Sequence, residues 1–176
     1  MLKKVVILGP ESTGKSTLAE ALAKHFDCPW VPEFAREYVA KLTRPYTFDD
    51  LEEIARGQIR LEDLTALSTE QLLICDTDLL VLKVWSQHKY GTVSPWIEEQ
   101  IGKRKYDLYL VTDIDIPWSA DPQREYPEPE MRQYFFDWYK KLAAESGVPY
   151  RIISGKEKER KALAVQIIQE QLIKIN

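Results

Sequence analysis

The chain has 176 residues and a formal net charge of −4, with 44% hydrophobic and 30% charged residues. This composition is typical of one globular domain whose core needs no disulfide or structural metal. The net negative charge argues against a broad nucleic-acid-binding surface, and no apolar run is long enough to span a membrane. Cys28 and Cys75 lack metal-ligand spacing, so we interpret both as buried residues of a reducing compartment. Because no signal peptide precedes the first expected strand, we expect a cytoplasmic protein.

The first expected element is a buried strand over residues 4–8, and the stretch that follows it reads Gly9-Pro10-Glu11-Ser12-Thr13-Gly14-Lys15-Ser16. This stretch fits G-x-x-x-x-G-K-[ST], the phosphate-binding loop (P-loop) of nucleoside triphosphate enzymes. A helix is expected to follow, because Leu18, Leu22 and Phe26 recur at helical spacing. Strand, glycine-rich turn and helix form the anion site that this chemistry requires. The sequence therefore predicts a nucleoside triphosphate site.

Residue types within this loop suggest their roles. Lys15 is expected to reach the terminal phosphates of ATP, and the Ser16 hydroxyl to bind Mg²⁺. Glu11 is electrostatically unexpected beside phosphate, and we expect its side chain to point away. The predicted nucleotide-binding residues are Gly9, Glu11, Ser12, Thr13, Gly14, Lys15, Ser16 and Thr17.

Strands and helices are expected to alternate along the rest of the chain. A short strand over 30–33 precedes a helix over 34–42, and a capping box of Thr47 and Asp50 opens a long helix. Further strands are expected over 72–75, 106–112 and 150–153, and further helices over 79–88, from Pro95 to about 103, from about 131 to Gly147, and at the end of the chain. The residues expected to face inward are Leu51, Ile54, Leu61 and Leu64 on the long helix, and Leu163, Ile167, Ile168 and Leu172 on the last helix.

This alternation predicts the α/β fold class. We expect a three-layer P-loop hydrolase or kinase fold with a five-stranded parallel sheet, formed by one domain over residues 1–176. The remaining tryptophans, Trp30, Trp85, Trp96 and Trp138, and the histidines His25 and His88, are interpreted as packing or structural residues.

Asp76 ends a strand of four apolar residues, at the sheet edge where such folds place ligands. In P-loop enzymes a carboxylate at this position holds Mg²⁺, usually through water. Alternatively this segment caps the next helix, a role that Thr77 or Asp78 would fill equally well. We predict that Ser16 and Asp76 form the metal site.

Glu33 follows the second strand, and Arg36 lies on the same helix face three residues later. A kinase that phosphorylates a sugar hydroxyl needs a carboxylate within hydrogen-bond reach of that hydroxyl. We therefore predict Glu33 as the base and Arg36 as a substrate ligand. The alternative is a helix cap with a surface ion pair.

Four prolines interrupt the chain after the fourth strand: Pro117, Pro122, Pro127 and Pro129. Such a segment forms neither a continuous helix nor a central strand, and we interpret it as a lid. Arg124 in this lid would stabilise charge on the transferring phosphoryl group. Trp118 would stack on a flat ring. The predicted catalytic residues are thus Lys15, Glu33, Asp76 and Arg124.

Several further motifs occur in order with the loop: Glu33-Phe34-Ala35-Arg36-Glu37-Tyr38, Arg56-Gly57-Gln58, Cys75-Asp76-Thr77-Asp78, Tyr106-Asp107-Leu108-Tyr109, Asp113-Ile114-Asp115-Ile116-Pro117-Trp118, Asp121 and Arg124. Together they resemble the ribosylnicotinamide kinase domain of NadR-type proteins, over nearly the whole chain. The resemblance implies ATP- and Mg²⁺-dependent phosphorylation of nicotinamide riboside at its 5′-hydroxyl, giving nicotinamide mononucleotide. It also implies that Gln58, Asp113, Asp115 and Trp118 help to hold this substrate.

Proteins of this type often carry a nucleotidyltransferase domain and sometimes a DNA-binding module. Because the loop begins at residue 9, we expect neither adenylyl transfer nor gene regulation from this chain. Two alternatives stay open: another nucleoside or nucleotide kinase of the same fold, and a regulatory nucleotide-dependent switch that phosphorylates nothing. A conventional GTPase is disfavoured because no Asn-Lys-x-Asp motif occurs.

Overall fold

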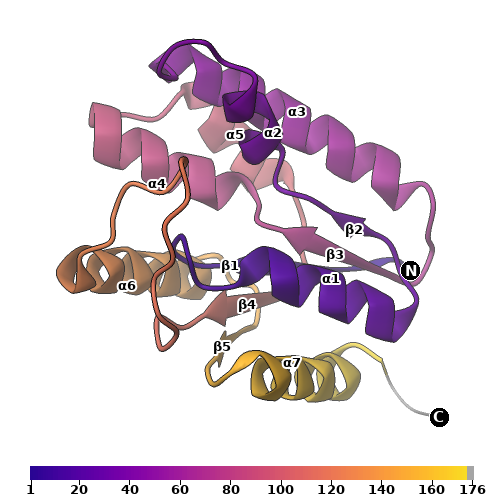
Figure 1. Cartoon of the computed structure of the whole chain (residues 1–176). Helices are drawn as coiled ribbons and strands as arrows, with labels where there is room; N and C mark the ends of the chain where they lie inside the picture. The colour runs from indigo at the N-terminus through magenta and orange to yellow at the C-terminus, as the bar shows by residue number, and fades with distance from the viewer. Residues whose placement is uncertain (174–176) are drawn as a thin grey trace.

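A five-stranded sheet lies at the centre of the computed structural model, which describes residues 1–173 (Figure 1). The strands are β1 (Lys3–Leu8), β2 (Trp30–Val31), β3 (Leu72–Asp76), β4 (Leu108–Thr112) and β5 (Tyr150–Ile153). The helices are α1 (Lys15–Phe26), α2 (Phe34–Ala40), α3 (Phe48–Ala66), α4 (Leu79–Tyr90), α5 (Pro95–Lys103), α6 (Pro129–Glu145) and α7 (Glu157–Gln171). All the pairings in the order β2-β3-β1-β4-β5 are parallel, which confirms the predicted fold class.

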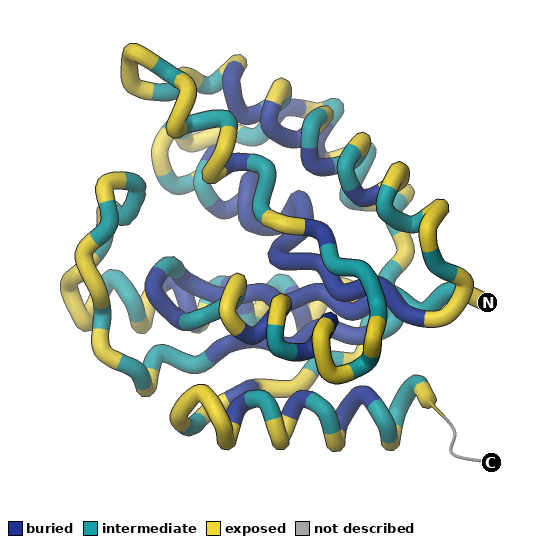
Figure 2. The backbone as a smooth tube through the Cα atoms, turned by 45° about the vertical axis from the view of Figure 1, so that its right-hand side comes forward, coloured by how far each residue is buried: buried dark blue, intermediate teal, exposed yellow. Residues whose placement is uncertain are grey.

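Helices cover both faces of this sheet, so β3 and β4 are buried throughout and β1 is buried from Val5 onward (Figure 2). Val5 and Ile7 of β1 pack in the core beneath α1 and α7, whereas Val6 and Leu8 pack in the core beneath α4 and α6. A smaller apolar cluster joins α2, α3, α4 and α5. None of the helices described over residues 1–173 is long and apolar enough to cross a membrane.

Two residues that we expected to face inward are exposed. Leu64 is 61% exposed near the end of α3, where the buried neighbour is Glu62, engaged by Lys4 and Arg104. Leu163 is 37% exposed because the inward positions of α7 are Arg160, Ala164, Ile167 and Ile168, which recur with the helical period. Both predictions were wrong, since a polar residue occupies an inward position on each helix.

The second strand ends at Val31 rather than at residue 33. Pro32 has no N–H group to continue the ladder, and Glu33 becomes the N-cap residue of α2. Gln58 of α3 fixes this junction: its Oε1 atom accepts from the Phe34 N–H at 2.7 Å, and its Nε2 atom donates to the Pro32 carbonyl at 3.3 Å. The buried Gln58 side chain thus fixes the backbone on both sides of Glu33.

Gly57 lets α3 approach the Phe34 ring, since a Cβ atom there would lie 2.0 Å from the ring atom Cε1. We expect Gly57→Ala to destabilise the protein by about 1–3 kcal/mol through overpacking. In Gly102→Ala on α5 the new Cβ meets no atom within 4 Å, so this control should be neutral or stabilised by up to about 1 kcal/mol. Urea unfolding of both variants measures the difference. Equal stabilities would contradict the close approach of α3 to Phe34.

Candidate nucleoside triphosphate site

The loop between β1 and α1 lies at the carboxyl end of the sheet and has the backbone shape of an anion cradle. Gly9 has φ +147° and Gly14, the N-cap of α1, has φ +77°, conformations that favour glycine. A Cβ atom on Gly9 would lie 2.4 Å from the Oγ1 atom of Thr112 on β4. Glycine is therefore required at residue 9 by the close packing of the loop against β4.

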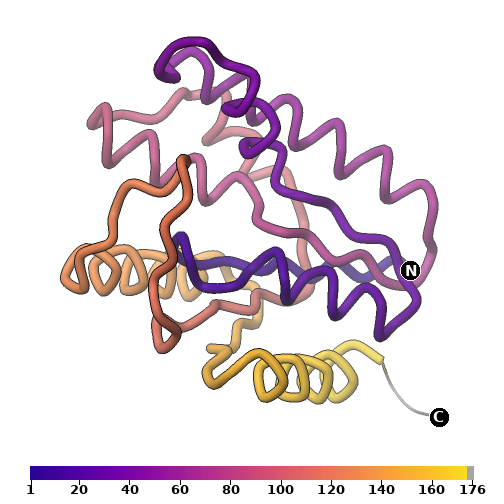
Figure 3. Tube along the Cα trace, viewed as in Figure 1, coloured from indigo at the N-terminus to yellow at the C-terminus, as the bar shows by residue number. Residues whose placement is uncertain are grey.

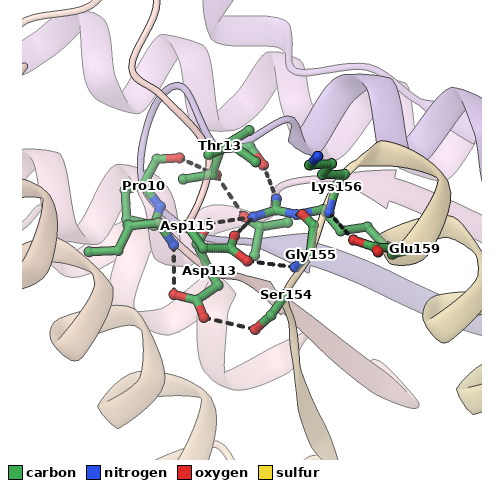
Figure 4. A network of polar contacts seen from close by, with 12 residues as sticks. Pro10, Thr13, Asp113, Asp115, Ser154, Gly155, Lys156 and Glu159 are labelled. Carbon is green, nitrogen blue, oxygen red and sulfur yellow. Dashed lines mark hydrogen bonds and ion pairs between the residues drawn. The ribbon is translucent and has the colours of Figure 1, made fainter.

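Arg160 of α7 holds this loop from behind, at a position that no sequence motif indicated. Its buried guanidinium donates to the Thr13 carbonyl at 2.5 Å and to the Asp113 carbonyl at 2.9 Å. It also donates to the Gly155 carbonyl at 2.7 Å and pairs with the Asp115 carboxylate. Figure 4 shows these segments converging, and Arg160 therefore ties the P-loop to the segments after β4 and β5.

The structure places Asp113 and Asp115 in this network and away from the cavity described below. The Asp113 carboxylate accepts from the Ser154 hydroxyl at 2.8 Å, and the Asp115 carboxylate accepts from the Gly155 N–H at 2.5 Å (Figure 4). Both side chains are occupied by the loop that follows β5. We therefore assign them to positioning these loops, in place of the acceptor binding that the resemblance implied.

Lys15, Ser16 and Asp76 meet where β1, β3 and α1 adjoin. The Lys15 ammonium donates to the Pro10 carbonyl at 2.7 Å, and the Ser16 hydroxyl donates to the Oδ2 atom of Asp76 at 2.5 Å. Asp78 supplies the helix cap instead: its carboxylate accepts from the Leu80 N–H at 2.9 Å and from the Tyr109 hydroxyl at 2.7 Å. Asp76 is thus free of the capping role.

The donor set at Asp76 fits a magnesium ion. Its Oδ1 atom is buried without a hydrogen-bond partner among the described residues, beside the Ser16 hydroxyl. Burial raises the pKa of the Asp76 carboxyl, whereas Lys15 and the Ser16 hydrogen bond lower it. Residues 1–173 hold no cluster of three or more histidine, cysteine or acidic side chains suited to a metal. A site of one carboxylate and one hydroxyl suits Mg²⁺ completed by substrate phosphates and water.

A cavity of about 330 Å³ opens beside the P-loop. Its other walls come from α2, α4, α6 and the residues after β4, and Glu33, Arg36 and Arg124 contribute to them. The aromatic lining residues are Tyr46, Trp85, His88, Tyr126, Phe135 and Tyr139. Trp85 and His88 were expected only to pack; they reach the cavity because α4 presents one side to it. Gln58 and Trp118 do not line it.

Glu33 lines the cavity from the start of α2, and its side chain makes no capping hydrogen bond. Burial raises the pKa of its carboxyl, Lys15 lowers it, and the nearby Asp76 carboxylate raises it. Arg36, one turn later, lies 3.0 Å from the Asp121 carboxylate in the lid. Glu33 thus places a buried carboxylate in the cavity wall near the phosphate loop.

The proline-rich segment arches over the P-loop between β4 and α6 (Figure 3). The Ser119 N–H donates to the Ser12 hydroxyl at 2.8 Å, and Arg124 donates to the Ser119 carbonyl at 2.5 Å. Glu11, which we expected to point away, faces this segment and accepts from the Tyr126 N–H at 2.6 Å. N–H groups of the lid thus offset the charge of Glu11, a compensation that the sequence alone did not indicate. We call residues 117–127 the lid.

Comparison with known proteins places this site in a family. The model of the AAA domain family AAA_28 matches residues 4–160. The chain belongs to this AAA domain family. It is also 24% identical, over 97% of its length, to the trifunctional NAD biosynthesis/regulator protein NadR of Escherichia coli (strain K12). The chain spans 43% of the length of that relative.

Solved structures agree on the fold of this AAA domain family member. A NadR protein in complex with NR matches with a TM-score of 0.80 and 24% identity, over 97% of this chain and 49% of that one. A NadR protein in complex with NAD and AMP-PNP matches with a TM-score of 0.79 and 24% identity, over 99% and 51%. Thymidylate kinase from Ehrlichia chaffeensis matches with a TM-score of 0.68 and 12% identity, over 96% and 99%. The P-loop kinase fold and the resemblance to NadR are therefore confirmed.

Proposed function

We propose that the chain is an ATP- and Mg²⁺-dependent kinase that phosphorylates the 5′-hydroxyl of nicotinamide riboside to nicotinamide mononucleotide. One observation carries this proposal: the P-loop opens into an aromatic-lined cavity of about 330 Å³ that also holds Glu33. A hydrolase or switch needs no such space for a second molecule. NadR proteins solved in complex with NR and with AMP-PNP support both the acceptor and the donor.

The cavity walls suit the charged ring of nicotinamide riboside. Its pyridinium ring is flat and cationic, and aromatic faces attract cations. Tyr46 and Trp85 are stacked with centroids 6.3 Å apart, and the Lys89 ammonium already lies 3.7 Å from the Tyr46 centroid. Glu11, Glu33 and Glu125 add carboxylates to the lining. Because the cavity is also lined by the cationic residues Lys15, Arg36, Arg44, Lys89 and Arg124, a cationic ring would be held by the aromatic faces and not by the net charge of the walls.

The proposed reaction assigns each polar residue one task. Glu33 accepts the proton of the 5′-hydroxyl while that oxygen bonds to the γ-phosphorus, and the bond to the bridging oxygen breaks to release ADP. Lys15 turns from Pro10 to the transferring phosphoryl group, and Arg124 approaches it from the lid. Ser16 and Asp76 would hold Mg²⁺, which supplies charge neutralisation at the β- and γ-phosphates.

A second candidate is a kinase for another nucleoside or a nucleoside monophosphate, because thymidylate kinase shares the fold over 99% of its length. The acceptor panel that separates the two contains nicotinamide riboside, thymidine, deoxyadenosine and their monophosphates, each with ATP and Mg²⁺. ADP formation is followed by a coupled assay. Turnover of nicotinamide riboside with the highest kcat/KM supports the proposal, whereas turnover of thymidine or a monophosphate alone contradicts the proposed acceptor.

A further inference from the structure

Glu11 presents a carboxylate within the loop that is shaped for phosphate, and its contacts all lead to the lid. Its Oε1 atom accepts from the Tyr126 N–H at 2.6 Å and lies 3.4 Å from the indole nitrogen of Trp118. Its Oε2 atom accepts from the Glu125 N–H at 3.1 Å. These donors lie 107 to 115 residues away in the sequence. One carboxylate thus gathers three N–H groups from both ends of the lid.

The charge of Glu11 couples its contacts with the lid to the binding of a triphosphate. A carboxylate beside a bound triphosphate repels it, most strongly where water is excluded. Hydrogen bonds from the lid disperse that charge, so the latched lid reduces the repulsion. If the lid opens, Glu11 loses its donors and faces the phosphates without compensation. Binding of triphosphate and latching of the lid therefore favour each other.

A second hydrogen bond joins the lid to the P-loop next to Glu11. The Ser12 hydroxyl accepts from the Ser119 N–H at 2.8 Å, so the lid touches two successive residues of the P-loop. Arg124 lies between these contacts and lines the cavity. Without the Glu11 contacts, this part of the lid would be held mainly by Arg36, which lies 3.0 Å from the Asp121 carboxylate and whose carbonyl accepts from the Gln123 side chain at 3.0 Å. We therefore expect the segment that carries Arg124 to loosen when these contacts are lost.

We propose that Glu11 is a positioning residue that latches the lid onto the P-loop and so keeps water from the terminal phosphate of ATP. The part concerning phosphoryl transfer rests on the proposed kinase function; the latch itself does not. Without the latch, water attacks the γ-phosphorus in place of the acceptor hydroxyl, and ADP and inorganic phosphate are released. The consequence is hydrolysis uncoupled from transfer.

Two replacements of Glu11 separate its latch from a general structural role. In Glu11→Gln the side-chain NH₂ group faces a lid N–H group, and one hydrogen bond is lost because both groups are donors. The same replacement removes the negative charge that repels phosphate. In Glu11→Asp the charge remains, but the shorter side chain withdraws from the lid. We therefore expect unchanged or tighter AMP-PNP binding in Glu11→Gln and weaker binding in Glu11→Asp. A merely structural role would weaken binding in both.

Hydrogen exchange of the full-length protein tests the latch without any acceptor. Amides in the peptide covering 118–127 should exchange about tenfold faster in both Glu11 variants. The loss of one hydrogen bond to a charged acceptor changes the opening equilibrium of the lid by about this factor. Trp118→Phe, which removes the indole N–H alone, should shift exchange less and in the same direction. Glu128→Gln alters an exposed carboxylate beyond the lid and should leave exchange unchanged. Unchanged exchange in Glu11→Gln overturns the latch.

The proposed exclusion of water is measured by a ratio of two rates: ADP release in the absence of acceptor, divided by phosphoryl transfer to nicotinamide riboside. This ratio should rise several-fold in Glu11→Gln and stay at the wild-type value in Glu128→Gln. An unchanged ratio despite faster lid exchange overturns the role in excluding water. If the wild-type protein does not phosphorylate nicotinamide riboside, the proposed acceptor fails, whereas the exchange result still decides the latch.

Discussion

Lys15→Ala is expected to lower the rate of phosphoryl transfer about 10²–10³-fold, the usual cost of losing one electrostatic contact to charge that develops in a transition state. The fold should survive, because the Pro10 carbonyl that accepts from Lys15 also accepts from the Thr13 hydroxyl at 2.7 Å. Steady-state kcat and KM for ATP, with circular dichroism of the folded protein, provide the measurement.

Lys24→Ala is the matched control for Lys15→Ala, since it removes an exposed ammonium near the other end of α1. Its turnover should equal that of the wild-type protein. Near-normal turnover of Lys15→Ala would show that the P-loop does not act on the transferring phosphoryl group here.

Glu33→Gln and Asp76→Asn are expected to lose activity in different ways. Loss of a general base costs about 10²–10⁴-fold, and Glu33→Gln should be slow at every Mg²⁺ concentration. Asp76→Asn removes a magnesium ligand, so its activity should recover in part as Mg²⁺ is raised. The placement supports this assignment, because Glu33 lines the cavity while Asp76 lies beside Ser16 with one unpartnered oxygen. A magnesium titration of both variants with the opposite pattern would exchange the two roles.

The pH dependence of kcat gives a second test of Glu33 as the general base. Its pKa is raised above the ordinary carboxyl value of 4.5, and only the deprotonated form accepts the hydroxyl proton. Activity should therefore fall as the pH is lowered through this raised pKa. In Glu33→Gln that part of the acidic limb should disappear, leaving the contribution of Asp76, whose pKa is also raised.

Local patterns were enough to predict the sheet, the P-loop and the pair formed by Ser16 and Asp76. Each of these depends on neighbouring residues: apolar runs for strands, glycine spacing for the loop, and a carboxylate at the end of a buried strand. The choice between Asp76 and Asp78 as the cap needed the structure, because only the hydrogen bonds of Asp78 to Leu80 and Tyr109 settle it.

Contacts between distant segments account for what the sequence did not reveal. Arg160 meets the Thr13 carbonyl 147 residues away, and nothing in the sequence near either residue marks that pairing. Glu11 looked misplaced because its lid donors are also remote in sequence, 107 to 115 residues away. Trp85 and His88 lie on a helix with apolar residues on most sides, so the spacing of residues could not separate the side facing the cavity from the sides facing the core.

Isotope transfer from ATP tests the proposed kinase reaction most directly. ATP labelled with ¹⁸O in its γ-phosphoryl group is incubated with the wild-type protein, Mg²⁺ and nicotinamide riboside, and the products are analysed by mass spectrometry. We expect the labelled phosphoryl group in nicotinamide mononucleotide, in an amount equal to the ADP formed. Label found only in inorganic phosphate, with nicotinamide riboside unchanged, would contradict the proposed kinase and favour a nucleotide-dependent switch.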